Sequence, residues 1–453
     1  MDGASIAVAE LTRSLAAQAS GLKYGDLPEP VRELARQCLL DYLACAVAGA
    51  DDPLVQILLD EAAEAGGAPQ ASVIGCRDRL PVLSAALVNG AAAHALDYDD
   101  VNLAMPGHPS VAILPGLLAL AELRGSSGAE VLAAFVAGYE TACRIGMAMQ
   151  PGHYALGFHA TGTVGCFGAA AACARLLGLD AEATARALGI AGTQAAGLKS
   201  QFGTMCKPFH AGKASQNGLL AARLAARGFS SRTDLVECVQ GFAATHGPDF
   251  APQAALAAPS RGFHLLANLF KYHAACYMTH APIECARQLR EQHGFAPEAI
   301  AQATLSLDGG CDRICNIPAP GDGLQSKFSL RQTVAMALAG VDTASLGAYS
   351  VATATDPALV KLRERVAINF REGWPSTVAE LSLTLADRRE VRARHDSGIP
   401  ADDIGSQSER LAAKFDALVE PVLGGSRSRE LRQLIAGLDT LADVGDLNRL
   451  AAR

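Results

Sequence analysis

Helical periodicity governs the first 250 residues of this 453-residue chain. From residue 8 to about residue 250, apolar residues recur at intervals of three and four, the spacing of one face of an α-helix. In residues 28–50, for example, Val31, Leu34 and Cys38 share such a face. Further helices are predicted over 80–95, 112–123, 129–149, 162–177, 180–196 and 213–227. We therefore expect a large domain of stacked helices.

The pattern changes near residue 265. Residues 301–309 and 377–395 alternate apolar and polar side chains, as half-buried strands do, whereas 324–340 and 356–370 favour helices. The predicted fold class is mainly α with a smaller α+β domain. The helical domain is built from 1–264 and 398–453, and the α+β domain from 265–397. A ligand would naturally bind between two such domains.

Composition excludes several classes of protein. The net charge is −8 and the pI is near 5.8, so the chain offers no basic stripe for nucleic acid. Charged residues make up only 19% of the chain, below the usual fraction of about a quarter. Together with abundant Ala and Gly, this low charge predicts much surface buried between helices or subunits, and we expect a homodimer.

No membrane span or disulfide framework is expected. The apolar stretches 43–50 and 111–121 are shorter than the roughly 20 residues that cross a bilayer. The N-terminal run MDGASIAVAELTRS lacks a basic region before an apolar one. Twelve cysteines without CxxC pairs are typical of reduced, mostly buried thiols. These features predict a cytoplasmic protein.

The segment from His94 to His108 is the first candidate site. It follows an apolar helix, is broken by Pro106 and Gly107, and places two imidazoles and three carboxylates near one helix end. Carboxylates orient histidines, and histidine titrates near neutral pH, so the pattern favours acid–base chemistry. Metal binding and simple helix capping by Asp are alternative interpretations of the same residues.

Two glycine-containing loops that lead into helices are the next candidates. Residues 152–162 leave backbone N–H groups free to hold an anion and place His159 beside them. Residues 202–213 carry Lys207, and the helix that follows is expected to begin near Lys213. A buried lysine there would neutralise a carboxylate or accept a proton, whereas an exposed one is simply a solvated charge.

A fourth candidate spans residues 271–280. Cys276 and His280 are four residues apart, so they would share a helix face and allow thiolate catalysis. The Ala-rich surroundings favour a buried, inert thiol instead. The sequence contains no dinucleotide or P-loop glycine motif, no HExxH and no paired CxxC, so we predict neither a cofactor nor a metal.

Together these segments resemble the MmgE/PrpD family, which includes 2-methylcitrate dehydratase, cis-aconitate decarboxylase and iminodisuccinate epimerase. The resemblance covers nearly the whole chain. It rests on the strings HALDYDD with GHPS, GHYALGFHATGTVGCFGAA, FGTMCKPFHAGKASQNG, LFKYHAACYMTH and LQSKFSL. It implies a helical domain built from both chain ends, an α+β lid domain, a homodimer and metal-independent chemistry on a small carboxylate substrate.

The resemblance also implies site residues. The family's active-site aspartate, two loop histidines, first lysine and lid lysine fall on Asp97, His108, His159, Lys207 and Lys271. His280 is a further catalytic candidate, and the substrate-binding candidates are Gly157, Thr161 and Cys276. In our hypothesis Asp97 orients a histidine, and either His108 or His159 removes the proton.

Three departures argue against cis-aconitate decarboxylation. Val101 replaces a substrate-binding Thr, Cys276 replaces a His, and residues 314–316 lack an expected Tyr. Because all family reactions form or quench a carbanion beside a carboxylate, we predict a cofactor-independent dehydratase of the 2-methylcitrate type. An iminodisuccinate-type epimerase is the alternative, followed by the decarboxylase. From other classes, a metal-dependent hydrolase and an inactive structural dimer also fit.

Overall fold

The computed structural model describes residues 10–453, which form two compact units. The first unit runs to Phe270 and includes Ala401–Arg453, and the second is Lys271–Pro400. Residues 265–270 belong with the first unit, where Leu269 pairs with Val101. Residues 8 and 9, where the predicted helical region begins, and most of the N-terminal run lie outside the described residues.

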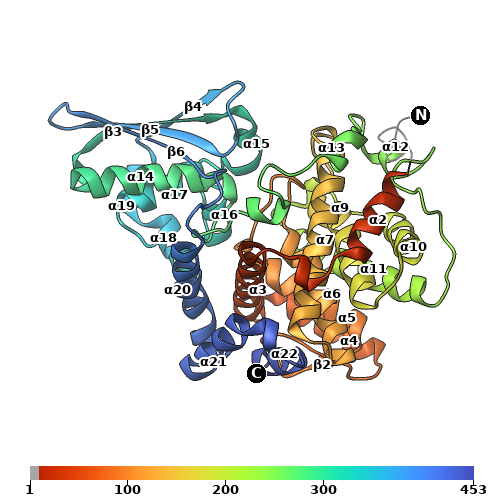
Figure 1. The fold of residues 1–453 in the computed structure, drawn as a ribbon. Helices are drawn as coiled ribbons and strands as arrows, with labels where there is room; N and C mark the ends of the chain where they lie inside the picture. Colours follow the sequence, from red (N-terminus) through yellow and green to blue (C-terminus); the bar gives the residue numbers. More distant parts are fainter. Residues whose placement is uncertain (1–9) are drawn as a thin grey trace. The chain divides into compact units, whose positions relative to one another are not determined.

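The first unit is helical, as the periodicity predicts (Figure 1). Its longer helices are α2 (Leu11–Gly21), α3 (Glu29–Gly49), α4 (Pro53–Ala65), α5 (Val82–Ala95), α6 (Pro109–Arg124), α7 (Gly128–Met149), α9 (Ala160–Leu176), α10 (Ala181–Gly192), α11 (Cys206–Ala226), α20 (Ile404–Leu423) and α21 (Gly425–Ala436). The shorter ones are α8 (Gly152–Ala155), α12 (Phe242–His246), α13 (Pro252–Leu256) and α22 (Gly445–Ala451), beside a small β1–β2 pair (Ala71–Ser72 and Arg79–Leu80).

Glycines let α5, α9 and α11 pack with their backbones in contact. A Cβ at Gly212 of α11 would lie 2.2 Å from the carbonyl oxygen of Leu87 in α5. A Cβ at Gly162 of α9 would lie 2.5 Å from the Ala196 carbonyl oxygen and 3.2 Å from the His210 Cβ. Close-packed interiors have no room for an added atom at such distances. These contacts bring the end of α5 and the beginnings of α9 and α11 together.

Replacing Gly212 with alanine is therefore expected to lower the free energy of unfolding by about 1–3 kcal/mol, because the added methyl group meets a backbone carbonyl. Chemical denaturation followed by circular dichroism measures this loss. The matched control is Gly21→Ala at the end of α2, where a Cβ would meet no atom within 4 Å. Equal stabilities of the two variants would contradict the close packing.

Helix α7 is long and apolar enough to cross a membrane. The two short apolar stretches of the sequence did not indicate this helix. It has 22 residues, and 83% of its most apolar window is buried inside the protein. Helices α3 and α4 pass the same test only as a pair, and they are bent by 84° at their junction. A helix that is apolar on most sides and buried among other helices is a core element.

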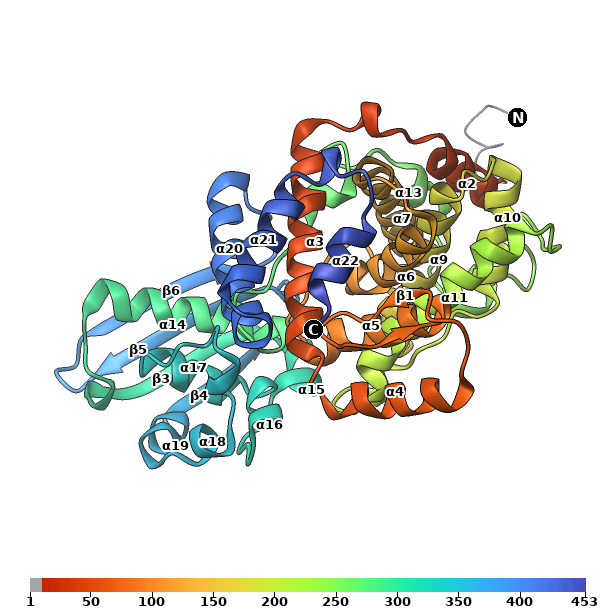
Figure 2. The same cartoon turned by 90° about the horizontal axis from the view of Figure 1, so that it is seen from below.

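The C-terminal part of the chain completes the helical unit. Helix α20 packs against α3, and the two lie side by side in both views (Figures 1 and 2). Lys414 of α20 and Asp41 of α3 form a buried ion pair, with Nζ 2.6 Å from Oδ1. The two ends of the chain are thus joined within one core.

The second unit is built on a four-stranded sheet with the order β4-β3-β5-β6. Strands β3 and β4 are parallel, whereas the other two pairs are antiparallel. Apolar residues of the sheet form one core with helices of the same unit. The strands are β3 (Ile300–Asp308), β4 (Val366–Arg371), β5 (Val378–Leu385) and β6 (Glu390–Asp396), and the helices are α14 (His280–His293), α15 (Asp312–Cys315), α16 (Gly323–Lys327), α17 (Leu330–Leu338), α18 (Val351–Thr355) and α19 (Pro357–Arg363).

Three expected helices were wrong in part. The predicted helix 324–340 is interrupted at Phe328 and Ser329, between α16 and α17. The predicted helix 356–370 ends at Arg363, and β4 follows because Val366, Ile368 and Phe370 alternate along a strand that pairs with β3. Helix α11 begins at Cys206, well before Lys213. Pro208 lies in its first turn, where a missing N–H costs the helix nothing.

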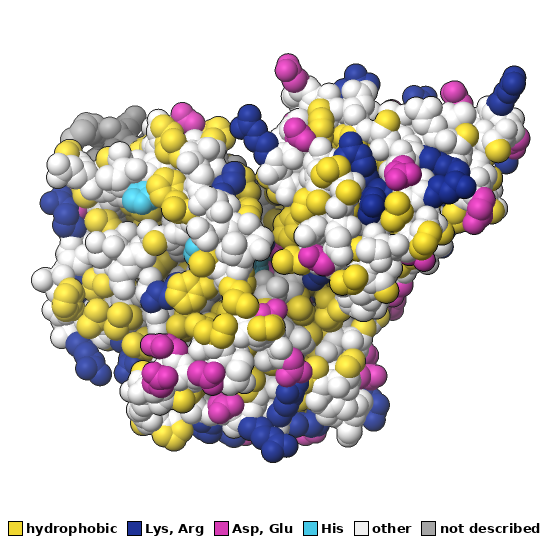
Figure 3. Space-filling model, turned by 180° about the vertical axis from the view of Figure 1, so that it is seen from behind, with side chains coloured by type: hydrophobic (Ala, Val, Ile, Leu, Met, Phe, Trp, Pro, Cys, Tyr) yellow, Lys and Arg dark blue, Asp and Glu magenta, His cyan; other side chains and the backbone are white. Residues whose placement is uncertain are grey.

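Charged side chains are scattered over the surface of the protein in Figure 3, with Lys and Arg among Asp and Glu. Several large apolar side chains are also exposed. Leu156 and Leu198 are 61% and 51% exposed, and Leu198 forms an isolated β-bridge with Phe158. These loops lead into α9 and α11, the helices that carry the candidate site.

Candidate active site

The chain turns sharply at Asp97, directly after α5. Asp97 has a left-handed backbone conformation with a φ of 53°, which aspartate tolerates better than most residues. His94 lies in the last turn of α5, and the turn brings Asp99 back beside it. The distance from His94 Nδ1 to Asp99 Oδ1 is 2.9 Å.

Three helices begin around this turn. His108 is the N-cap residue of α6, His159 is the N-cap residue of α9, and Lys207 lies in the first turn of α11. Neither histidine uses its side chain to cap its helix, so both rings are available for other contacts. Free N–H groups and the helix dipoles attract anions at such positions.

Lys207 and Asp97 form an ion pair in the middle of this cluster. Lys207 Nζ lies 2.8 Å from Asp97 Oδ1, and only about a tenth of each side chain is exposed, 10% and 11%. His108 Nε2 is 3.9 Å from the same oxygen. Phe202 covers the ammonium group, with its ring centre 5.2 Å from Nζ. The shielding strengthens the attraction between the charges and holds the ammonium group in place.

Asp99 is fully buried and contacts two imidazoles. Its Oδ1 is 2.9 Å from His94 Nδ1, and its Oδ2 is 3.0 Å from His108 Nδ1. The backbone oxygen of Asp100 also lies 2.9 Å from His108 Nδ1. Burial alone would raise the pKa of Asp99, but the two imidazoles outweigh burial and hold that pKa well below its usual range.

His94 is a neutral ring in this environment. Burial lowers its pKa to about 4, in spite of the attraction of Asp99. Its ring is stacked on that of His159, with centres 5.9 Å apart, and is tilted against that of His108, with centres 4.5 Å apart. Among the described residues, its Nε2 atom is buried without a hydrogen-bond partner.

His159 has a different kind of partner. Its Nδ1 lies 3.1 Å from Nδ1 of His210, so one of the two rings donates a proton to the other. Burial lowers the pKa of His159 well below its usual value, and the neighbouring His94 and Lys207 lower it further. Burial likewise lowers the pKa of His210 to about 4. Both rings are therefore neutral near pH 7.

The buried ion pair between α3 and α20 supports the turn from behind. Lys414 Nζ donates to the Tyr98 carbonyl oxygen at 2.6 Å, and it also lies 3.9 Å from the centre of the Tyr98 ring. Asp41 provides the countercharge. Removal of either partner of a buried ion pair leaves an uncompensated charge, which is strongly destabilising. Helix α20 thereby fixes the backbone between Asp97 and Asp99.

Asp100 is the second fully buried carboxylate behind the site. It accepts a hydrogen bond from Ser110 Oγ at 2.5 Å. Burial and the nearby Asp41 raise the pKa of Asp100 to about 7. Its protonation state therefore changes close to neutral pH.

This raised pKa predicts a stability that falls as the pH rises. The folded state binds a proton to Asp100 more tightly than the unfolded chain, whose Asp pKa is about 3.9, so its contribution is lost as the pH rises through 7. Asp100→Asn keeps an acceptor for Ser110 and removes the charge. We expect thermal melts between about pH 5 and pH 8 to show a flatter pH dependence for this variant, with a gain of no more than about 4 kcal/mol at the alkaline end.

The control for this measurement is Asp60→Asn on α4, because Asp60 is exposed and lies on a different helix. It should reproduce the wild-type pH dependence. The account of Asp100 fails if Asp100→Asn and the wild type lose stability in parallel.

The predicted residues of the first unit lie together. Asp97, His108, His159 and Lys207 surround the turn, and Thr161 Oγ1 accepts a hydrogen bond from the His108 N–H at 3.1 Å. Gly157 has a φ of 108°, and its carbonyl accepts a hydrogen bond from the Lys199 N–H. Its backbone conformation is one that favours glycine.

The other three predicted residues, Lys271, Cys276 and His280, lie in the second unit and are buried there. His280 Nε2 is 3.3 Å from the Ala275 carbonyl oxygen. Cys276 belongs to the apolar core of that unit, together with Cys315. Their participation in the site stays a prediction.

Sequence reasoning missed the contacts of His94, Asp99 and His210. It expected Asp97 to orient a histidine, whereas Asp97 is closest to Lys207 and Asp99 contacts both rings. The five-residue spacing of His94 and Asp99 across a helix end is the signal that was present. The contact of His159 with His210 joins two helices and leaves no local signal.

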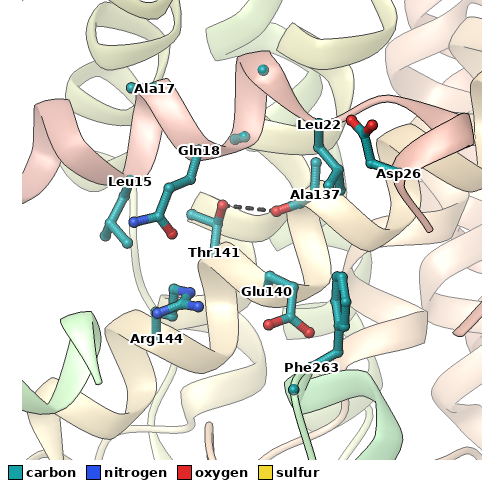
Figure 4. Close-up of a pocket in the computed structure, with 13 residues that line it drawn as sticks. Leu15, Ala17, Gln18, Leu22, Asp26, Ala137, Glu140, Thr141, Arg144 and Phe263 are labelled. Carbon is teal, nitrogen blue, oxygen red and sulfur yellow. Dashed lines mark hydrogen bonds between the residues drawn. The ribbon is translucent and has the colours of Figure 1, made fainter. Parts of the chain in front are cut away.

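A pocket of about 420 Å³ lies elsewhere in the first unit, between α2 and α7 (Figure 4). Two of its charged side chains, Glu140 and Arg144, are bonded to the chain's own backbone. Glu140 accepts a hydrogen bond from the Leu265 N–H at 3.0 Å, and Arg144 donates one to the Ala255 carbonyl at 2.8 Å. These bonds attach Ala255 and Leu265 to α7, so Glu140 and Arg144 have structural roles.

Comparison with protein families confirms the resemblance. The MmgE/PrpD N-terminal domain matches residues 13–255, and the MmgE/PrpD C-terminal domain matches residues 273–440. The chain therefore belongs to the MmgE/PrpD family.

Its relatives include named enzymes. It is 29% identical to cis-aconitate decarboxylase of Aspergillus terreus, over 97% of this chain and 95% of the relative. It is 28% identical to cis-aconitate decarboxylase of Homo sapiens, over 97% and 94%. It is 31% identical to the cis-aconitate decarboxylase-like protein oryM of Aspergillus oryzae, over 66% of each chain.

Proposed function

We propose that this protein is a cofactor-independent lyase that dehydrates a small di- or tricarboxylate of the 2-methylcitrate type. One observation carries the proposal. The site combines a fixed ammonium group at Lys207 with two imidazoles in different environments, His108 against a buried carboxylate and His159 against another imidazole. Family membership supports the same class of chemistry.

Carboxylate groups of the substrate would bind at the positive end of the cluster. Lys207 provides the cation, and the helix dipoles of α6, α9 and α11 add partial positive charge at their N-terminal ends. Loss of the proton next to a carboxylate spreads negative charge onto that carboxylate, and donors fixed in advance stabilise such charge most effectively. We propose that Lys271 adds a second cation from the second unit.

Dehydration requires both a base and an acid. A C–H bond and the neighbouring C–O bond break, a C=C bond forms, and the hydroxyl group leaves as water after it is protonated. Epimerisation also needs two proton-transfer groups, one on each face of the carbon. Two imidazoles in one cluster, His108 and His159, provide such a pair.

Decarboxylation of cis-aconitate is the second candidate. It is favoured by the similarity to the decarboxylases of Aspergillus terreus and Homo sapiens. This reaction needs no base at carbon, because the broken C–C bond leaves its electrons there and only a proton donor is required. Val101 and Cys276, where the family resemblance implies Thr and His, argue against it.

Proton NMR in D₂O with 2-methylcitrate, citrate, cis-aconitate and iminodisuccinate tests the proposal on chelator-treated protein. Dehydration predicts loss of the hydroxy acid. Citrate would give a new vinyl proton signal. 2-Methylcitrate dehydrated at its methyl-bearing carbon gives an alkene without a vinyl proton, so its methyl doublet would be replaced by the singlet of a methyl group on a double bond. Deuterium entry alone would indicate the epimerase, and consumption of cis-aconitate with loss of CO₂ would indicate the decarboxylase. A folded protein that turns over none of the four acids would contradict the proposal and favour an inactive structural dimer.

Variants on α11 and α9 test the site within the same assay. Lys207→Ala and His159→Ala should each lower turnover on the order of 100-fold or more, the usual size of an acid–base or charge-stabilising contribution. Lys213→Ala is the matched control because Lys213 is on the same helix as Lys207 and contacts Gln216. Near-wild-type turnover of Lys207→Ala would contradict the proposed site.

A metal-dependent hydrolase is the remaining enzyme class. Donor atoms of His94, Asp97, Asp99 and His108 lie within 4.8 Å of one another, a spacing that a divalent ion can span. In this structure these donors contact one another and Lys207 instead. Activity that disappears on chelation and returns with a divalent ion would support the hydrolase.

The homodimer and the cytoplasmic location stay predictions. Sedimentation velocity tests the homodimer.

A further inference from the structure

We propose that Asp99 and His94 are positioning residues that make His108 the proton-accepting histidine of the site and leave His159 as a neutral partner. The assignment to a reaction rests on the proposed function. The geometric part, which is the tautomer and partner of each ring, stands on its own contacts.

The surroundings of His108 determine which ring nitrogen carries a proton. Nδ1 faces Asp99 Oδ2 at 3.0 Å and the Asp100 backbone oxygen at 2.9 Å. Both neighbours are acceptors, so Nδ1 must be the donor and the lone pair of the neutral ring is on Nε2. Nε2 lies on the side of Asp97 and the Lys207 ammonium group, where the substrate carboxylate would bind.

A proton taken up by His108 would be stabilised by Asp99. The resulting imidazolium stays 3.0 Å from a buried carboxylate, and such an attraction is strong where water is excluded. His159 has His210, His94 and Phe202 as ring neighbours. A charge on His159 would gain nothing comparable and would be repelled by Lys207. The two loop histidines are therefore not equivalent.

His94 has a place in the same arrangement. Its Nδ1 is 2.9 Å and 3.1 Å from the two oxygens of Asp99, and its ring lies against those of His108 and His159. It therefore fixes the carboxylate that holds His108 and keeps the two loop rings apart. The titratable groups that face His108 are His94 on α5, Asp97 and Asp99 in the turn, His159 at α9 and Lys207 on α11.

Nitrogen NMR of the histidine-labelled protein tests the geometric part without a substrate. Near neutral pH, His94 and His108 should both show a protonated Nδ1 and an unprotonated Nε2. Asp99→Asn should remove the strongly downfield N–H proton signals that a buried carboxylate produces. A protonated Nε2 on either ring of the neutral wild type would overturn the inference, whatever reaction the protein catalyses.

Steady-state kinetics tests the role of Asp99. The substrate is whichever of 2-methylcitrate, citrate, cis-aconitate and iminodisuccinate the protein turns over. Asp99→Asn should lower kcat by about 100-fold or more with little change in KM, because the substrate is held elsewhere. The pH profile of kcat/KM should change as well, because Asp99 contacts the ring that accepts the proton. His94→Gln should lower kcat by a smaller factor of about ten.

The matched control is His153→Gln. His153 is equally buried in the same unit but is bonded to Thr163 Oγ1 and the His246 carbonyl, away from Asp99. Thermal melts establish that each variant is folded. Wild-type kcat and an unmoved pH profile in folded Asp99→Asn would overturn the inference. If no acid of the panel is turned over, the proposed function fails, and the tautomers alone decide whether Asp99 positions His108.

Discussion

The contact between one buried carboxylate and two imidazoles is the interaction on which the rest of the site depends. Asp99 is removed from water and keeps its charge because His94 and His108 both contact it. Its charge in turn fixes the orientation of His108 and leaves Nε2 exposed toward the Lys207–Asp97 pair. A carboxylate that orients a histidine in this way removes the need for rearrangement during proton transfer.

The packing of the helical unit holds that contact in place. Glycines at the crossings of α5, α9 and α11 let three helix ends meet in a space that any side chain would fill. Behind the turn, Lys414 of α20 donates to the Tyr98 carbonyl oxygen and to the carboxylate of Asp41. The return of the chain's C-terminal end to the first unit thus has a functional consequence, because it locks the backbone on which Asp97 and Asp99 are placed.

Much of this could be predicted from local patterns. Spacings of three and four predicted the helical unit, and alternation predicted β3 and the segment that contains β5 and β6. His108, His159 and Lys207 were predicted because they lie in polar or glycine-containing segments next to helices, and because the family resemblance implies site residues at these positions. The contact between Asp99 and His108, the pairing of His159 with His210 and the parallel partner of β4 join residues distant in space or sequence. Such contacts depend on how helices and strands pack, which no single segment encodes.

The most direct test of the account is a crystal structure of the protein with an unreactive saturated tricarboxylate. The account predicts one carboxylate on Lys207 Nζ and the first turns of the helices, with the α carbon within about 3–3.5 Å of His108 Nε2, the distance of a reactive arrangement. It would be contradicted by an analogue bound away from these groups, for example in the pocket beside Glu140, or by an α carbon that faces His159 while His108 remains remote from it.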